Sequence, residues 1–355
     1  MSKATIILSI DPTNPEPELI EQAASVLRRG GLVAFPTETV YGLGALALDE
    51  SAVLGIYQAK GRHSDNPLIV HVTDTSALES VVREVSPVAQ ACVDHFWPGP
   101  LTLILPKQEH VPQVVTAGLD TVAVRSPMHP IARALIAAAG PIAAPSANLS
   151  GKPSPTTAEH VIQDLFGIVD VIIDGGSATV GLESTVVDPA LGAILRPGSV
   201  THQDLQAVGV HMSPAPLQMS AKPSHEQPTS PGQKHKHYAP NAKATLVLGT
   251  TQSTTSYIKS QLASHSEPNA IAVLSTHEHL ESYAGSLTVS LGREQDLPDI
   301  AANLYARLRD FDTPQHEHIA HIYVQASFHD SHNPLSLSIM DRLIRACSYN
   351  VIHTT

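Results

Sequence analysis

Four groups of polar residues flank apolar, strand-like segments in the N-terminal half of the chain. They are Arg125, Ser146-Ala147-Asn148, Glu183-Ser184-Thr185 and Arg196-Pro197-Gly198. A guanidinium can hold a carboxylate through two hydrogen bonds, and small polar residues at strand ends often line a ligand crevice. Any one of these groups alone is typical of a turn, a cap or an exposed ion pair. Four of them in one domain predict a converging site for an anionic ligand.

Two cations, Lys60 and Arg62, flank Gly61 where a predicted helix ends. Glycine lets a backbone approach a ligand closely, and the two cations can neutralise a phosphate. The same charges would also complement the negative end of a helix dipole. The cluster alone leaves both interpretations open, and the four strand-end groups in the same domain favour the phosphate site.

Basic and aromatic residues also gather in the segment 231–240, PGQKHKHYAP, at the end of a proline-rich stretch. One interpretation is a tethered lid that folds over a phosphate-bearing ligand and excludes water. The alternative is the solvated, charged end of a linker.

The motifs give little support to dinucleotide binding, to a phosphate loop, to a serine nucleophile or to a metal site. Residues 42–47 fit GxGxxA, but Pro36 and the polar residues after it interrupt the strand that a dinucleotide fingerprint needs. Neither a GxxxxGK[ST] loop nor a GxSxG elbow is present. Three histidines lie within residues 316–321, but their spacing is not HExxH, which favours solvated surface histidines over a metal site.

Length and composition narrow the class of protein. The 355 residues suit two domains, and 42% hydrophobic with 15% charged residues excludes a disordered or coiled-coil chain. The net charge of −12 argues against a surface for duplex nucleic acid. Cys92 and Cys347 predict neither a disulfide framework nor a CxxC metal site. Since the sequence shows no membrane-length apolar run and no secretory pattern, we expect a soluble, cytoplasmic protein.

A composition break divides the chain. Prolines among Ser, Gln and Lys over residues 211–231 predict an extended linker. We therefore expect a large domain over residues 1–210, a Pro-rich linker or lid over 211–241, and a smaller domain over 242–355.

Helix and strand signals alternate on both sides of this break. In the first domain, helices are predicted over 16–29, from an Asp49 cap to Lys60, and over 88–95, 130–139 and 158–166. Its strands are predicted over 32–35, 68–72, 101–105, 122–125, 142–144, 171–173 and 194–195, with no readable strand order. In the second domain, strands over 244–248, 270–274, 287–290 and 319–324 and helices over 253–263, 298–309 and 335–347 are predicted. That alternation indicates a parallel, Rossmann-like sheet.

Several motifs of the first domain occur in the order seen in YrdC-domain proteins. They are FPTETVYGLG (35–44), Lys60-x-Arg62 leading to Asn66-Pro67-Leu68, WPGPLT (97–102), APSAN (144–148), Glu183-Ser184-Thr185 and Arg196-Pro197-Gly198. The linker end KHYAP (236–240) is similar to that of the long, two-domain threonylcarbamoyl-AMP synthases. The chain resembles this family nearly throughout its first domain and more weakly in its second.

The resemblance implies an α/β fold class: a YrdC-like twisted α/β domain with a concave basic cavity, followed by a smaller Rossmann-like α/β domain. It also implies a reaction in which L-threonine, bicarbonate or CO2, and ATP give threonylcarbamoyl-AMP, pyrophosphate and water. Mg2+ would enter with ATP, held mainly by the phosphates and not by a metal site of the protein. The product would pass to a tRNA threonylcarbamoyltransferase. We expect no membrane partner and no direct binding of tRNA.

Matching positions imply two sets of site residues. Those that would face ATP are Lys60, Arg62, Ser64, Thr121, Ser146, Asn148, Ser154, Arg196 and Tyr238. Those that would hold L-threonine are Thr37, His71, Arg125, Ala144 and Ser184, with Arg125 on the carboxylate. Catalysis would rest on Lys60, Arg62 and Arg196, through positioning and charge neutralisation without a covalent intermediate.

Two other functions compete with this one. Hydrogenase-maturation carbamoyltransferases also contain a YrdC-type domain, but they carry zinc-finger and acylphosphatase modules, for which this chain has neither a paired CxxC nor room. The alternative of another class is an RNA-binding module that uses the concave basic face. The net charge and the lack of interleaved aromatic residues argue against it.

Overall fold

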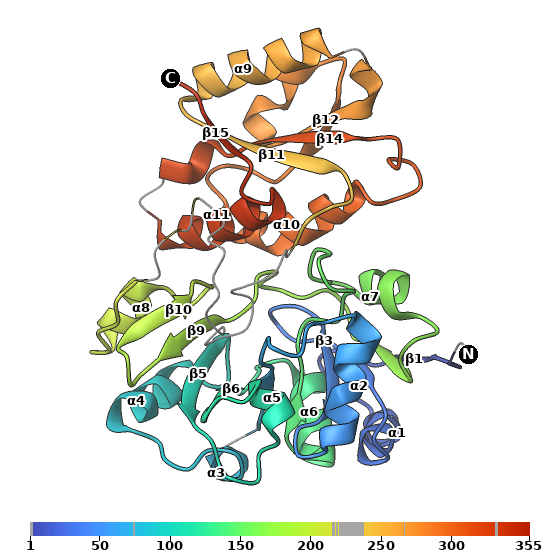
Figure 1. Cartoon of the computed structure of the whole chain (residues 1–355), viewed down its shortest axis with the longest axis vertical. Helices are drawn as coiled ribbons and strands as arrows, with labels where there is room; N and C mark the ends of the chain where they lie inside the picture. Colours follow the sequence, from blue (N-terminus) through green and yellow to red (C-terminus); the bar gives the residue numbers. More distant parts are fainter. Residues whose placement is uncertain are drawn as a thin grey trace. The chain divides into compact units, whose positions relative to one another are not determined.

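Figure 1 shows the computed structural model of the chain, which describes residues 3–73, 75–214, 217, 219, 238–265, 267–330 and 333–355. These residues divide into two compact units. The first unit holds residues 3–150 and 154–214, and the second holds 151–153, 217, 219 and 238–355.

A mixed ten-stranded sheet forms the centre of the first unit, in the order β1-β8-β2-β3-β7-β4-β6-β5-β9-β10. The strands are β1 (Ile6–Ser9), β2 (Val33–Phe35), β3 (Gly42–Leu46), β4 (Ile69–His71), β5 (Leu101–Pro106), β6 (Thr121–Arg125), β7 (Ile142–Ala143), β8 (Val171–Asp174), β9 (Thr185–Asp188) and β10 (Ala193–Arg196). The helices are α1 (Pro17–Arg28), α2 (Glu50–Lys60), α3 (Thr75–Glu79), α4 (Pro87–Phe96), α5 (Gln113–Thr116), α6 (Pro130–Ala139), α7 (Ala158–Leu165) and α8 (His202–Ala207). Successive residues of β2 enter different apolar clusters, Ala34 one and Val33 with Phe35 the other, so both faces of the sheet are covered.

Local signals place the helix ends close to where the sequence predicts them. Pro17 opens α1, and the Asp49 carboxylate caps α2 by accepting from the Ala52 N–H at 3.0 Å. Gly61 ends α2 in the left-handed conformation, with φ of 60°, which most side chains avoid. Lys60 is thereby left in the last turn of α2, where it is buried.

Strand pairing brings three polar side chains together. His71 of β4 lies opposite Arg125 of the parallel strand β6, and Thr102 of β5 lies opposite Arg125 from the antiparallel side. Residues directly opposite one another in a sheet point to the same face. Ser184 comes just before β9, which pairs with β5 in parallel. The order β4-β6-β5-β9 therefore gathers residues that lie far apart in the sequence.

The segment that fits GxGxxA forms β3, a strand absent from the predictions. β3 pairs antiparallel with β2 (Val33 opposite Gly44), so Gly42 and Gly44 lie inside the strand, and α2 begins only at Glu50. A dinucleotide fingerprint places its glycines in the tight turn from strand into helix, so this geometry excludes it. A Cβ on Gly44 would lie 2.7 Å from Ile142 Cγ2 and 2.9 Å from the Phe35 ring. Glycine at this position therefore permits close packing inside the sheet.

The second unit is a parallel sheet of five strands in the order β13-β12-β14-β11-β15, which confirms the predicted Rossmann-like alternation. Its strands are β11 (Lys243–Leu248), β12 (Ile271–Ser275), β13 (Leu287–Ser290), β14 (His321–Gln325) and β15 (Val351–His353), the last not predicted. Its helices are α9 (Thr251–Ser264), α10 (Leu297–Asp310) and α11 (Pro334–Ala346), with short 3-10 turns η1 (Pro268–Ala270), η2 (His277–Tyr283) and η3 (Ser327–Asp330). Helix α9 covers one face of the sheet, and α10 and α11 cover the other (Figure 1). Across the described residues, no helix is both long and apolar enough to cross a membrane.

Candidate active site

Arg125, at the end of β6, is the buried centre of the site. With only 3% of its surface exposed, it donates through Nε to the Gly99 carbonyl oxygen (3.1 Å) and through Nη1 to the Thr39 hydroxyl (2.7 Å). Nη2 lies 2.6 Å from Oε1 of Glu38, which is equally buried. The turn before β5 and the loop after β2 therefore hold the guanidinium from two sides.

The ion pair leaves hydrogen-bonding capacity on both partners. Oε1 of Glu38 and Nη2 of Arg125 are close in space, but neither has a hydrogen-bond partner among the described residues. The other Glu38 oxygen accepts from the Met128 backbone N–H at 3.2 Å. The two atoms neutralise each other as a close ion pair without forming a hydrogen bond, so both can still hydrogen-bond to a ligand.

His71 faces the same place from β4. Its imidazole is buried against the Phe35 ring, edge to face with centroids 6.1 Å apart, and within the described chain Nδ1 finds no hydrogen-bond partner. Burial and the positive charge of Arg125 lower the pKa of His71 to about 3. The ring is therefore neutral near pH 7, so one nitrogen donates and the other accepts.

Ser184 connects this cluster to a second guanidinium. Its hydroxyl lies 2.7 Å from the hydroxyl of Thr102, the strand neighbour of Arg125. Arg196 donates to the Ser184 carbonyl oxygen from Nε (3.1 Å) and Nη2 (2.9 Å), and Nη2 also reaches the hydroxyl (3.2 Å). Side-chain contacts thus run from Arg196 through Ser184 to Thr102, which pairs in the sheet with Arg125 of β6.

The loop between β2 and β3 is held by its own hydroxyls. Thr37 Oγ1 donates to the Val40 carbonyl oxygen (2.6 Å) and lies 2.8 Å from Oγ1 of Thr39, which accepts from Arg125. Ala144, just after β7, is tied to β4 by its N–H, which donates to the Ile69 carbonyl oxygen at 2.9 Å. The residues predicted to hold threonine therefore lie on elements that meet around Arg125.

Lys60 reaches from the end of α2 to the loop after β7. Its Nζ donates to the Ser146 carbonyl oxygen (2.5 Å) and to the Asn148 carbonyl oxygen, with the Asn148 side-chain oxygen at 3.5 Å. The Ser146 hydroxyl donates to that same side-chain oxygen at 2.5 Å. Three residues predicted to face ATP thus form one cluster, in which a buried positive charge acts in a low dielectric.

Other residues predicted to face ATP lie in more open places. Arg62 is half-buried and donates to the carbonyl oxygens of Asn66 (3.3 Å) and Pro67 (3.0 Å) in the turn after α2, where Ser64 is exposed. Thr121 begins β6 and Arg125 ends it, so they stand about 13 Å apart at the usual rise of a strand. This separation suits contacts with different parts of the ligands.

Ser154 contacts the segment that carries Ser184, one of the residues predicted to hold L-threonine. Its buried hydroxyl donates to Oε1 of Glu183 at 2.5 Å, and Glu183 directly precedes Ser184. The bond links one residue predicted to face ATP with the segment that carries a residue predicted to hold threonine.

Tyr238 belongs to the second unit. Its backbone has φ of 66°, and its ring centroid lies 5.2 Å from that of Tyr305 in α10. Residues 231–237, the basic part of the predicted lid, lie outside the described residues. The contact of Tyr238 with ATP stays a prediction.

Glu38, Thr39 and Thr102 lie inside the quoted motifs but received no predicted role. One sequence signal could have identified Glu38: it is the one charged residue in the stretch 30–48, which is otherwise uncharged and mostly apolar. A buried carboxylate requires a charged or hydrogen-bonded partner. The identity of that partner, Arg125, depends on the fold.

Comparisons with known proteins identify the family of the chain. A family model for Sua5, YciO and YrdC, described as telomere recombination, matches residues 25–198. A second model, described as the C-terminal domain of threonylcarbamoyl-AMP synthase, matches residues 200–348. The chain belongs to the YrdC-domain family, in its two-domain form.

Two of its curated relatives are named threonylcarbamoyl-AMP synthase. The Bacillus subtilis protein is 45% identical over 337 residues, 94% of either chain, and the Pyrococcus abyssi protein is 43% identical over 342 residues, 94% of this chain and 95% of the relative. The crystal structure of Pyrococcus abyssi Sua5 complexed with L-threonine matches with a TM-score of 0.90 at 41% identity, covering 99% of this chain and 100% of the other. The resemblance carried by the motifs is confirmed, and the chain is an enzyme of this family.

Proposed function

We propose that the first unit condenses L-threonine, CO2 and ATP into threonylcarbamoyl-AMP and pyrophosphate, and that one water is released where bicarbonate supplies the CO2. One observation carries this proposal: the buried guanidinium of Arg125 keeps unused hydrogen-bonding capacity at the centre of a polar cluster. The chain that contains it is similar along nearly its whole length to threonylcarbamoyl-AMP synthases. A carboxylate that enters the cluster meets a donor already held in place.

L-threonine would bind where β4, β6 and the loop after β2 meet. Arg125 takes its carboxylate, while the neutral imidazole of His71 and the hydroxyls of Thr37 and Ser184 supply further hydrogen bonds. Ala144 offers a methyl contact for the apolar part of the substrate. A site made mainly of buried, positioned groups favours one small amino acid over others.

ATP would bind beside it with Mg2+ on its phosphates. Lys60, Arg62 and Arg196 face the phosphates, and the polar groups of Ser64, Thr121, Ser146, Asn148 and Ser154 complete the site. The two buried carboxylates here, Glu38 and Glu183, are engaged by Arg125 and Ser154. Among the described residues, no three His, Cys, Asp or Glu side chains gather to hold a metal.

The chemistry takes two steps. The α-ammonium group of threonine first releases one proton, and the free amine then bonds to the carbon of CO2 and loses a second proton, which gives a carbamate. A carbamate oxygen then attacks the α-phosphorus of ATP in line, the bond from that phosphorus to the bridging oxygen breaks, and pyrophosphate leaves with the electron pair. Negative charge concentrates on the phosphates during the second step, so the three cations would lower its barrier. The product would pass to a tRNA threonylcarbamoyltransferase.

The test is pyrophosphate release from ATP and bicarbonate, with and without L-threonine, and with L-serine as the control amino acid. Release that depends on threonine and far exceeds release with serine is the expected result, together with an AMP adduct of the expected mass. Absence of release from protein that still binds ATP would overturn the proposal.

A further inference from the structure

We propose that Glu38 and Arg125 form a receptor for the zwitterionic head of the amino-acid substrate, in which Glu38 takes the α-ammonium group and Arg125 takes the α-carboxylate. The inference rests on the proposed function, which places the threonine carboxylate on Arg125. It adds a residue that determines specificity, and it defines the class of ligand as an α-amino acid carrying both charges.

The two side chains are held from behind and present their remaining atoms to each other. One Glu38 oxygen is occupied by the Met128 N–H at 3.2 Å. Arg125 is anchored through Nε on the Gly99 carbonyl oxygen (3.1 Å) and through Nη1 on the Thr39 hydroxyl (2.7 Å). The atoms left over, Oε1 and Nη2, are 2.6 Å apart, buried, and without a hydrogen-bond partner among the residues that the structure describes.

This arrangement matches the head of an α-amino acid. Its ammonium and carboxylate groups are attached to one carbon, so they lie side by side as Oε1 and Nη2 do. In the structure the two protein charges balance each other inside a buried site. A zwitterion can replace the Glu38–Arg125 ion pair with two new pairs, one between its ammonium group and Glu38 and one between its carboxylate and Arg125. Neither protein group is then left unpaired.

A ligand with a carboxylate alone cannot make this exchange. It would take Arg125 and leave the Glu38 carboxylate buried without a counter-charge, which is strongly unfavourable. His71 does not substitute as a counter-charge, because its pKa of about 3 keeps the ring neutral. Glu38 therefore selects α-amino acids over carboxylic acids that lack the α-ammonium group.

The experiment compares two ligands on two forms of the full chain by calorimetry. The ligands are L-threonine and 3-hydroxybutanoate, which has the same carboxylate, hydroxyl and methyl groups but no ammonium. We expect Glu38→Gln to weaken threonine binding by about 10- to 100-fold, the usual range for one lost hydrogen bond to a charged group. Binding of 3-hydroxybutanoate should stay the same or tighten, because Arg125 then lacks its internal counter-charge.

Matched variants separate this role from a structural one. Glu294→Gln, which removes a carboxylate 2.9 Å from His279 in the second unit, should leave both affinities unchanged. Glu38→Asp keeps the charge and should retain part of the preference for threonine, even if Glu38→Gln folds poorly. Equal losses for both ligands in Glu38→Gln, or no loss for either, would overturn the inference. Wild-type protein that binds no threonine would instead overturn the proposed function beneath it.

Discussion

The two units differ in how completely their buried polar side chains are hydrogen-bonded. In the second unit, Gln325 is fully buried at the end of β14 and makes every hydrogen bond that an amide can make. Its oxygen accepts from the hydroxyls of Ser275 (2.7 Å) and Tyr283 (2.8 Å), and its nitrogen donates to those of Thr254 (2.8 Å) and Thr255 (3.1 Å). The carboxyl ends of three elements are tied together by this one side chain.

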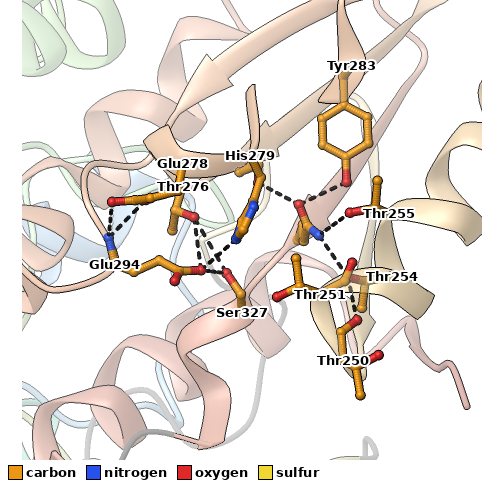
Figure 2. A network of polar contacts seen from close by, with 12 residues as sticks. Thr250, Thr251, Thr254, Thr255, Thr276, Glu278, His279, Tyr283, Glu294 and Ser327 are labelled. Carbon is orange, nitrogen blue, oxygen red and sulfur yellow. Dashed lines mark hydrogen bonds and ion pairs between the residues drawn. The ribbon is translucent and has the colours of Figure 1, made fainter. Parts of the chain in front are cut away.

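The carboxylate of Glu294, in the same unit, also has several hydrogen-bond partners. Oε1 of Glu294 accepts from the hydroxyls of Ser327 and Thr276 (3.3 Å) and lies 2.9 Å from Nε2 of His279 (Figure 2). The Glu294 backbone N–H donates to the Glu278 carboxylate at 3.2 Å. These bonds join the loops after β12, β13 and β14.

In the first unit, Arg125, Glu38 and His71 each keep one buried atom without a hydrogen-bond partner among the described residues. A saturated buried group can gain little from a ligand, whereas an unsaturated one gains a bond that the protein does not provide. Under the proposed function, the contrast separates polar residues that hold the fold from those that would bind a substrate. Substitutions should therefore affect activity in the first unit and stability in the second.

The largest effect is expected from Lys60→Ala, which removes a buried cation and its bonds to Ser146 and Asn148. If Lys60 stabilises charge on the phosphates, pyrophosphate release should fall by about 10²- to 10³-fold. Rates should be normalised to the folded fraction, measured by circular dichroism, since the loop after β7 also loses support. Near-full activity in Lys60→Ala would remove Lys60 from the catalytic group.

The second prediction concerns stability and the fully hydrogen-bonded side chain of the second unit. Gln325→Leu should lower the free energy of unfolding by about 2–3 kcal/mol, because hydroxyls such as that of Ser275 lose buried partners. Urea unfolding monitored in the full chain measures the loss, and threonine affinity should stay within about twofold. A large loss of threonine affinity with unchanged stability would mean that the saturated network has a role in binding.

A third prediction concerns pH. The ordinary histidine pKa of 6.5 falls to about 3 in folded His71, so between these values the unfolded chain binds the extra proton. Stability should therefore decrease as pH falls from 6.5 towards 3, by about 1.4 kcal/mol per pH unit from this residue. His71→Asn cannot titrate and should lose that part of the slope. Unfolding measured at pH 6.5, 5.5 and 4.5 for both proteins gives the comparison, and identical slopes would contradict a buried neutral ring.

The smallest effect is expected from Thr102→Val, which keeps the shape of the side chain but removes the hydroxyl 2.7 Å from Ser184. Ser184 retains its contact with Arg196, so only one neutral hydrogen bond is lost. The KM for threonine should rise by about two- to tenfold, with little change in kcat. An unchanged KM would place Ser184 outside the threonine site.

Helices and most strands were predictable because their signals are local. The predicted helix ends in the first unit, such as the Asp49 cap and the stop at Gly61, agree with α2, and every predicted element of the second unit is present within two residues of its predicted bounds. One strand that escaped prediction, β3, lacks such signals. β3 is glycine-rich, and it is a strand because β2 and β7 lie on either side of it and supply its hydrogen bonds.

For the site, residue types and motifs were enough to select the candidate residues, because a guanidinium, a lysine or a small hydroxyl keeps its chemistry wherever it stands. They could not say that His71 and Arg125 face each other, or that Glu38 is the counter-charge of Arg125. Those partnerships follow from the register of β4 on β6 and from the path of the loop after β2. Register and strand order are set by contacts between distant parts of the chain, and no short stretch of sequence contains them.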